Sequence, residues 1–79
     1  MDDVEAFVLV QTEAGKAAYV AGRVNEIPGV ISAYDVTGPY DVIVHVKSAT
    51  VDDLGKMVVS RLQLIDGITR TLTCPVVRL

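Results

Sequence analysis

The segment Thr37-Gly38-Pro39-Tyr40-Asp41-Val42 lies near the middle of the 79-residue chain, between two runs of β-forming residues. Its glycine supplies backbone freedom, its proline fixes its own φ angle, and its aspartate can accept hydrogen bonds from nearby backbone amides. The flanking runs, residues 30–36 and 42–47, are rich in β-branched and aromatic residues. The sequence therefore predicts an antiparallel hairpin with this segment at its tip.

Two further strands and two helices are expected around the hairpin. A continuous apolar run within residues 5–12 predicts the first strand. Apolar residues at helical spacing predict helices over about 13–26 and 51–65. Alternation within residues 68–77 predicts the last strand, and we expect it at a sheet edge because Pro75 cannot donate a ladder hydrogen bond.

The order β-α-β-β-α-β is accompanied by a weak internal repeat. Ile27-Pro28-Gly29-Val30 and Ile65-Asp66-Gly67-Ile68 occupy the same place in each half, 38 positions apart. Two βαβ halves with right-handed crossovers give an α+β, ferredoxin-like fold. We expect a four-stranded antiparallel sheet with strands one and three at its centre and two helices on one face.

The second face of this sheet is expected to pair with another copy of the chain. In the third strand we assign the three valines of residues 42–46 to the helix-covered face and Ile43, His45 and Lys47 to the other. The first strand is apolar on both faces, so a monomer leaves apolar surface uncovered. Because so short a chain buries little of its surface, we predict a face-to-face homodimer, the arrangement of a dimeric α/β barrel.

Composition and charge argue against several classes of protein. Hydrophobic residues make up 51% of the chain, which is too apolar for disorder. The net charge is −3 and the basic residues are scattered, so direct binding of nucleic acid is not expected. No apolar run approaches the roughly 18 residues of a membrane span, and the acidic start is unlike a signal peptide. We expect one cytoplasmic domain without a membrane partner.

Residues for catalysis or metal binding are scarce. Cys74 is the only cysteine, which excludes an internal disulfide and a cysteine-based zinc site. His45 is the only histidine, and we interpret it as a polar residue at a subunit interface. The sequence contains neither G-x-x-x-x-G-K-S/T nor G-x-G-x-x-G. We therefore predict no catalytic residue, no metal and no cofactor. A minor alternative is a small dimeric α/β-barrel oxygenase that uses His45, because such oxygenases share the predicted sheet topology.

Four polar residues remain as candidates for binding a small zwitterion. The carboxylate of Asp41 can take the ammonium group of an amino acid, and the freely oriented amides of its loop can take the carboxylate group; Tyr40 lies next to Asp41. The hydroxyls of Thr71 and Thr73 can bond either group. The alternative is that Asp41 caps a turn and that the threonines are ordinary edge-strand residues.

The whole chain resembles the ligand-binding and oligomerisation domain of the Lrp/AsnC regulators, the RAM domain (regulation of amino acid metabolism). The matching segments are Ala6–Val10, Ile27–Val30, Thr37–Val42 and Gly67–Thr73, and the Gly-x-Tyr-Asp loop is the most specific of them. The resemblance implies a ferredoxin-like fold, face-to-face dimers, frequent assembly of four dimers into an octameric ring, and amino-acid effectors bound between dimers.

By position, the resemblance makes Gly38, Tyr40 and Asp41 the effector loop. It also implies hydroxyls from Thr71 and Thr73, supplied by a neighbouring subunit.

The chain departs from the family in two places. Full-length members carry a helix-turn-helix domain before this one, so we expect residues 1–79 to be a single stand-alone RAM domain without a DNA-binding domain. Val42 stands where many members have an aromatic residue, which leaves the identity of the effector open.

Two hypotheses of function follow from the residues and the resemblance. The first is a non-enzymatic amino-acid sensor whose effector shifts the assembly of its subunits. Such a sensor would modulate transcription or metabolism, either by itself or by co-assembly with full-length relatives. The second is an assembly module without a ligand, in which the loop of residues 38–41 only makes subunit contacts.

Overall fold

A computed structural model describes residues 3–77, and its elements follow the predicted order β-α-β-β-α-β. The strands are β1 (Val4–Thr12), β2 (Val30–Asp35), β3 (Val42–Ser48) and β4 (Ile68–Pro75). The helices are α1 (Ala17–Val24) and α2 (Val51–Met57), and α2 continues directly into the π-helical segment η1 (Val58–Leu62). The first two and last two residues, including part of the acidic start, lie outside the described residues.

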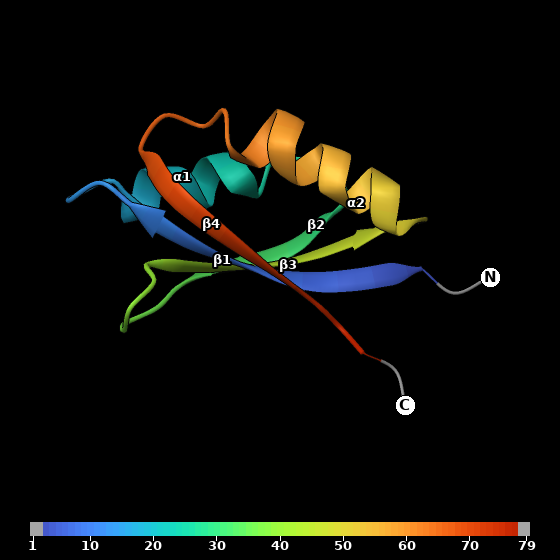
Figure 1. Ribbon diagram of the computed structural model, residues 1–79. Helices are drawn as coiled ribbons and strands as arrows, with labels where there is room; N and C mark the ends of the chain where they lie inside the picture. Colours follow the sequence, from blue (N-terminus) through green and yellow to red (C-terminus); the bar gives the residue numbers. More distant parts are fainter. Residues whose placement is uncertain (1–2, 78–79) are drawn as a thin grey trace.

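The strands form one antiparallel sheet in the order β2-β3-β1-β4. The predicted centre and edges are therefore confirmed, and Pro75 ends an edge strand, opposite Ala6. Both helices lie on one face of the sheet, and among the described residues no helix or strand covers the other (Figure 1). This is the ferredoxin-like fold predicted from the sequence.

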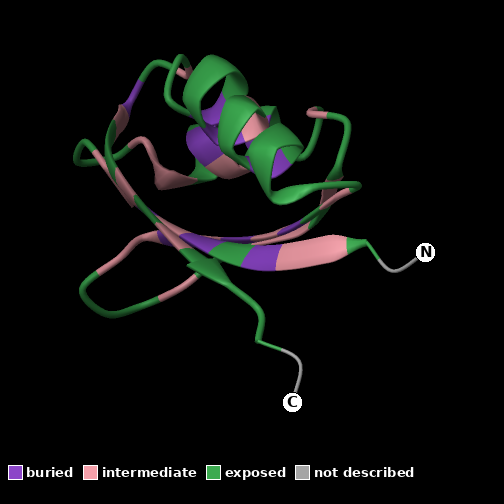
Figure 2. Cartoon of the chain, turned by 45° about the vertical axis from the view of Figure 1, so that its right-hand side comes forward, coloured by how far each residue is buried: buried purple, intermediate pink, exposed green. Residues whose placement is uncertain are grey.

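The core lies between the sheet and the helices. Alternate residues in the middle of the two central strands are completely buried: Ala6, Val8, Val10, Val42, Val44 and Val46. The helical side contributes Val20, Val24, Leu54, Val58 and Leu62. Figure 2 shows this buried layer between the helices and the sheet. Full burial of one valine or leucine contributes about 1.5–3 kcal/mol, so the assigned valine face is the main source of stability.

Helix α1 begins later than the sequence predicts. The amide of Glu13 donates to the carbonyl of Gly67 (2.8 Å), which holds residues 13–16 in a turn against the second half of the chain. Gly15 in this turn has φ +79°, and Lys16 at the start of the helix provides no side-chain cap. Helix α2 starts as predicted, because Thr50 Oγ1 accepts a hydrogen bond from the amide of Asp53 (3.0 Å).

The sheet surface opposite the helices, here called the open face, is largely apolar. Strand pairing places Phe7 opposite both His45 and Cys74, and Leu9 opposite both Ile43 and Leu72. Phe7 is 41% exposed and Leu72 is 45% exposed, although both lie in the sheet. Within residues 3–77, neither helix is long and apolar enough to cross a membrane.

Candidate functional site

The hairpin loop between β2 and β3 lies at the end of the sheet where β1 finishes. The amide of Val36 donates to the carbonyl of Asp41 (2.9 Å), which closes the loop. Gly38 has φ +143°, a conformation that side chains disfavour, and a Cβ there would contact nothing within 4 Å. The glycine is therefore required by backbone conformation, and the surface of the loop is open above it.

Asp41 connects this loop to the end of β1 through three hydrogen bonds. Its amide donates to the carbonyl of Val10 (2.9 Å) and its carbonyl accepts from Val36. Its carboxylate Oδ2 accepts from the amide of Thr12 (2.8 Å). The side chain is half-buried, and Oδ1 makes no hydrogen bond or ion pair with any other described residue. One oxygen thus holds the turn, as in the capping alternative, while the other remains available.

Gln11 fastens the tip of the same loop, because its Nε2 donates to the carbonyl of Pro39 (3.0 Å). Tyr40 is half-buried beside Asp41, and its hydroxyl makes no hydrogen bond within the described part of the chain. Sequence patterns predicted no role at this loop for Gln11 or Thr12. In the sequence, Gln11 and Thr12 form the polar end of an apolar strand. The loop residues that they contact lie 28 and 29 positions away along the chain.

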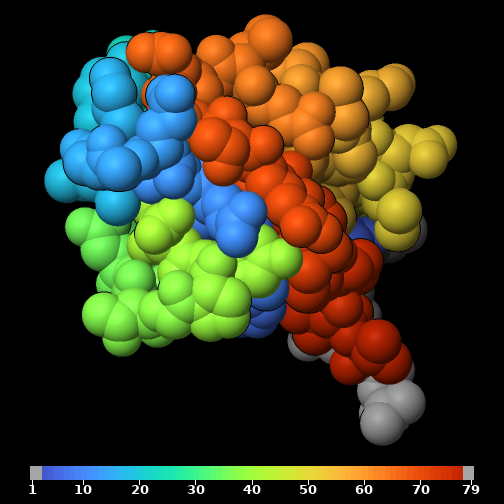
Figure 3. All heavy atoms as spheres, turned by 60° about the vertical axis from the view of Figure 1, so that its left-hand side comes forward, coloured from blue at the N-terminus to red at the C-terminus, as the bar shows by residue number. Residues whose placement is uncertain are grey.

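Thr71 and Thr73 lie on β4, opposite Val10 and Val8. They therefore face the helix side, half-buried, and Thr71 Oγ1 accepts a hydrogen bond from Gln63 Nε2 (3.2 Å). Strand β1 lies between β4 and β3, and two strand spacings amount to about 10 Å. Figure 3 shows the loop and β4 on the same side of the molecule, with part of β1 between them.

No contact within one subunit joins these threonines to the loop, as far as the described residues extend. A hollow of about 320 Å³ borders Thr71, and a separate one of about 540 Å³ lies at the base of the loop beside Thr37. Another, of about 510 Å³, lies between the helices and includes none of the predicted residues. The structure thus brings together Gly38, Tyr40 and Asp41, and the contribution of Thr71 and Thr73 from a neighbouring subunit stays a prediction.

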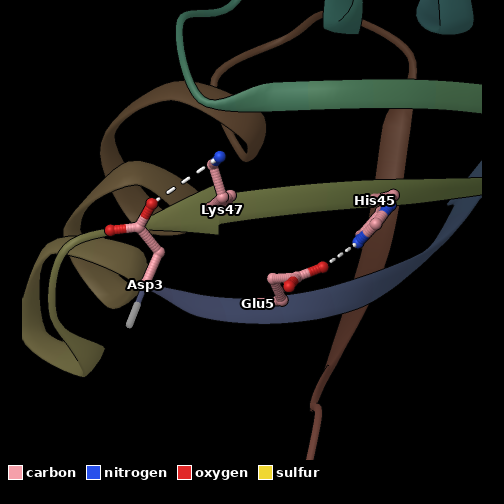
Figure 4. A network of polar contacts seen from close by, with 4 residues as sticks. All are labelled: Asp3, Glu5, His45 and Lys47. Atoms are coloured by element: carbon pink, nitrogen blue, oxygen red, sulfur yellow. Dashed lines mark hydrogen bonds and ion pairs between the residues drawn. The ribbon is translucent and has the colours of Figure 1, made fainter. Parts of the chain in front are cut away.

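A second polar group lies on the open face (Figure 4). His45 Nε2 lies 2.8 Å from Glu5 Oε1, and the imidazole stacks on the ring of Phe7 at a centroid distance of 4.6 Å. Lys47 Nζ, on β3, lies 3.6 Å from Oδ2 of Asp3, the residue just before β1. Within residues 3–77, His45 makes no hydrogen bond to a serine, threonine or cysteine side chain. The described residues also contain no group of three or more histidine, cysteine or acidic side chains placed to hold a metal.

Comparison with models of known protein families assigns the chain to one of them. Residues 5–79 match the family model described as the Lrp/AsnC ligand binding domain. The chain belongs to this family. The resemblance recognised in the sequence is therefore confirmed.

Individual relatives agree with this assignment. An uncharacterised HTH-type transcriptional regulator of Pyrococcus furiosus, PF0250, is 32% identical over 71 residues, which are 86% of this chain and 47% of the regulator. The chain thus spans about half the length of such curated relatives, which are mostly transcriptional regulators. It also matches 17% of a homocitrate synthase of Sulfurisphaera tokodaii, at 27% identity over 78 residues.

Solved structures match the fold closely. The crystal structure of TTHA0845 from Thermus thermophilus is 30% identical, with a TM-score of 0.90, and the match covers 96% of this chain and 95% of that one. AsnC of E. coli is 26% identical, also with a TM-score of 0.90, over 98% of this chain and 52% of AsnC. This chain is therefore a domain of the kind that longer transcriptional regulators carry.

Proposed function

We propose that this protein is a cytoplasmic, non-enzymatic module that binds an amino acid at the junctions between its subunits, and that the ligand shifts its assembly. The observation that carries this proposal is the Asp41 carboxylate. One of its oxygens accepts a hydrogen bond from the amide of Thr12, and the other makes no hydrogen bond or ion pair with the described residues. The family assignment supports a binding function, and the curated relatives, mostly regulators, support one without catalysis.

The homodimer forms through the open face. Exposed aromatic and aliphatic side chains from β1, β2 and β4 lie on one surface: Phe7, Tyr34 and Leu72 are 41%, 59% and 45% exposed. An exposed apolar surface of this kind in so short a chain is typical of an interface. A second copy offers a surface of the same shape, and two sheets pack about 10 Å apart.

The ligand lies against the loop of one subunit and β4 of another. Its ammonium group contacts Asp41 Oδ1, and its carboxylate accepts hydrogen bonds from loop amides and from hydroxyls such as that of Tyr40. Thr71 and Thr73 of the adjoining subunit complete the site. Because such a ligand binds only the assembled form, it stabilises assembly by RT ln(1 + [L]/Kd) per site. Four dimers closing into an octameric ring would create such junctions.

Isothermal titration calorimetry with each of the common amino acids tests this function. Asp41→Asn keeps an oxygen that can accept from Thr12 but removes the charge, so we expect affinity to fall about 10- to 100-fold, from a loss of about 1.5–3 kcal/mol. Asp52→Asn removes the same charge from the exposed first turn of α2 and should leave affinity unchanged. The sensing function is wrong if no amino acid binds at millimolar concentration, or if Asp41→Asn binds as tightly as the natural chain.

A second candidate is an assembly module without a ligand. It is favoured by the hydrogen bonds that already fasten the loop to β1, from Gln11 to Pro39 and from Thr12 to Asp41. In that case, Asp41→Asn changes the mass of the oligomer in light scattering, and no amino acid changes that mass in either protein. Co-assembly with full-length relatives is compatible with both candidates.

A further inference from the structure

Arg70 lies on β4, at the end of the sheet that carries the hairpin loop. Its register partner on β1 is Gln11, whose side chain donates to the carbonyl of Pro39 at the tip of the loop (3.0 Å). Side chains alternate along a strand, so Arg70 belongs to the open face with Leu72, whereas Thr71 faces the helices. Only the end of β1 therefore separates Arg70 from the loop.

The loop projects toward the same side of the sheet. Figures 1 and 2 show the hairpin between β2 and β3 bending away from the helices, and Figure 3 shows it beside β4 with part of β1 between them. Asp41 directly precedes β3, which is two strand spacings, about 10 Å, from β4. The stem of an arginine has three methylene groups and spans much of this distance. A small ligand can therefore contact Asp41 and Arg70 of one subunit together.

The other aspartate, glutamate, lysine and arginine side chains of the strands lie elsewhere. Glu5 and Lys47 are register partners at the opposite end of β1. Asp35 is the register partner of Val42 and so belongs to the helix-covered face. Arg70 is exposed and forms no ion pair with any described residue. At the loop end of the open face, the strands thus present one cation.

Asp41 and Arg70 present opposite charges to a ligand between them. In the proposed site, Asp41 Oδ1 contacts the ammonium group of the ligand, and loop amides donate to its α-carboxylate. The guanidinium of Arg70 offers parallel N–H donors that match a second carboxylate. A side-chain amide would bring no charge to Arg70, and a side-chain ammonium would be repelled by it. The arrangement favours a ligand with one ammonium and two carboxylate groups.

We propose that the ligand of this site is an acidic amino acid, and that Arg70 of the same subunit binds its side-chain carboxylate. This inference rests on the proposed function and names the class of its ligand. Arg70 lies nearer the end of the sheet than Leu72, so it occupies the rim of the proposed dimer. A ligand at this rim can enter from water while the apolar centre of the open face stays packed.

Isothermal titration calorimetry of the full chain tests the proposal. The probes are L-glutamate and L-aspartate, each compared with its neutral isostere, L-glutamine or L-asparagine. We expect one acidic probe to bind at least about 10-fold more tightly than its amide, because charge-assisted hydrogen bonds are stronger than neutral ones. Arg70→Gln should lower the affinity for this acidic probe about 10- to 100-fold and change the affinity for the amide less than about threefold.

Arg61→Gln is the matched control. Arg61 is an exposed residue of η1 and borders the hollow between the helices, on the covered side of the sheet. Its substitution removes the same charge from the protein and should retain both affinities. Arg70→Glu provides a gain of function, because a carboxylate at this position should make L-lysine bind more tightly than L-glutamate. Circular dichroism shows whether the three variants keep the natural fold.

The outcomes separate this inference from the proposed function. If a neutral or basic amino acid binds the natural chain more tightly than either acidic probe, the ligand class is wrong and the sensing function stands. The assignment of Arg70 is wrong if Arg70→Gln keeps the preference for the acidic probe over its amide, or if Arg70→Glu still prefers L-glutamate to L-lysine. If no amino acid binds at millimolar concentration, both this inference and the proposed function are overturned.

Discussion

Gly67 and Gly22 show how strongly the effect of one added methyl group depends on its position. Gly67 is buried with φ +100°, and a Cβ there would lie 3.2 Å from the Cβ of Lys16 and 3.3 Å from Cγ2 of Val20. Gly22 lies in α1 with a negative φ, and a Cβ there would contact nothing within 4 Å. The first glycine is required where the two halves of the chain meet, whereas the second only weakens its helix.

We expect opposite effects from alanine at these two positions. Gly67→Ala should lower the free energy of unfolding by about 1–3 kcal/mol, because the residue is forced into a left-handed conformation and toward α1. Gly22→Ala should raise it by about 0.5–1 kcal/mol through helix propensity. Urea unfolding, followed by circular dichroism, measures both changes; one fixed protein concentration is used because unfolding of the proposed dimer would be coupled to dissociation. A stabilising Gly67→Ala would contradict the strain assigned to this turn.

The candidate site shows how far sequence reasoning reaches at single residues. Gly38 and Asp41 could be predicted as candidate binding residues because turn chemistry is local. The structure brings them together with Tyr40 in one loop. The partners that orient Asp41 were missed, because Thr12 belongs to a strand 29 positions away. Such contacts depend on the order of the strands in the sheet, which cannot be deduced from a short segment of sequence.

At the scale of elements, the same distinction separates the starts of the two helices. The start of α2 is encoded locally, since Thr50 and Asp53 form a hydrogen-bonded cap three residues apart. The start of α1 was predicted about four residues too early. The carbonyl of Gly67, far along the chain, holds the amide of Glu13 and prevents the helix from beginning there. Strands and core faces were predictable because alternation and burial repeat regularly along the chain.

The cap of α2 provides a test at this scale. Thr50→Ala leaves an amide at the start of the helix without its side-chain acceptor, so the free energy of unfolding should fall by about 1 kcal/mol. Thr50→Ser keeps the hydroxyl and should recover most of this loss. Urea midpoints at constant protein concentration compare the three proteins. If alanine and serine have the same effect, the hydrogen bond to Asp53 does not stabilise the helix.

At the scale of the whole molecule, the arrangement of layers leaves one face of the sheet uncovered by any described helix or strand. The helices bury the centre of one face of the sheet, whereas the other face keeps large apolar side chains exposed. The same face carries the His45–Glu5 pair. The loop of residues 38–41 lies at the end of this sheet, so in the proposed dimer the packing of the two sheets would decide which subunits can share a ligand.

Leu72→Lys tests the role of the open face directly. Leu72 lies on β4 opposite Leu9 and is 45% exposed, so a lysine there can reach water in a monomer but is buried in a face-to-face dimer. We expect the dissociation constant to rise at least about 100-fold, corresponding to about 3 kcal/mol for burial of an unpaired charge. Light scattering should then show the mass of one subunit at micromolar concentration, while circular dichroism shows the natural fold.

The matched control is Leu64→Lys. Leu64 is 78% exposed and borders the hollow between the helices, on the covered side of the sheet. The same change of charge and length there should leave the dimer intact. If Leu64→Lys separates the subunits and Leu72→Lys does not, the helices form the interface.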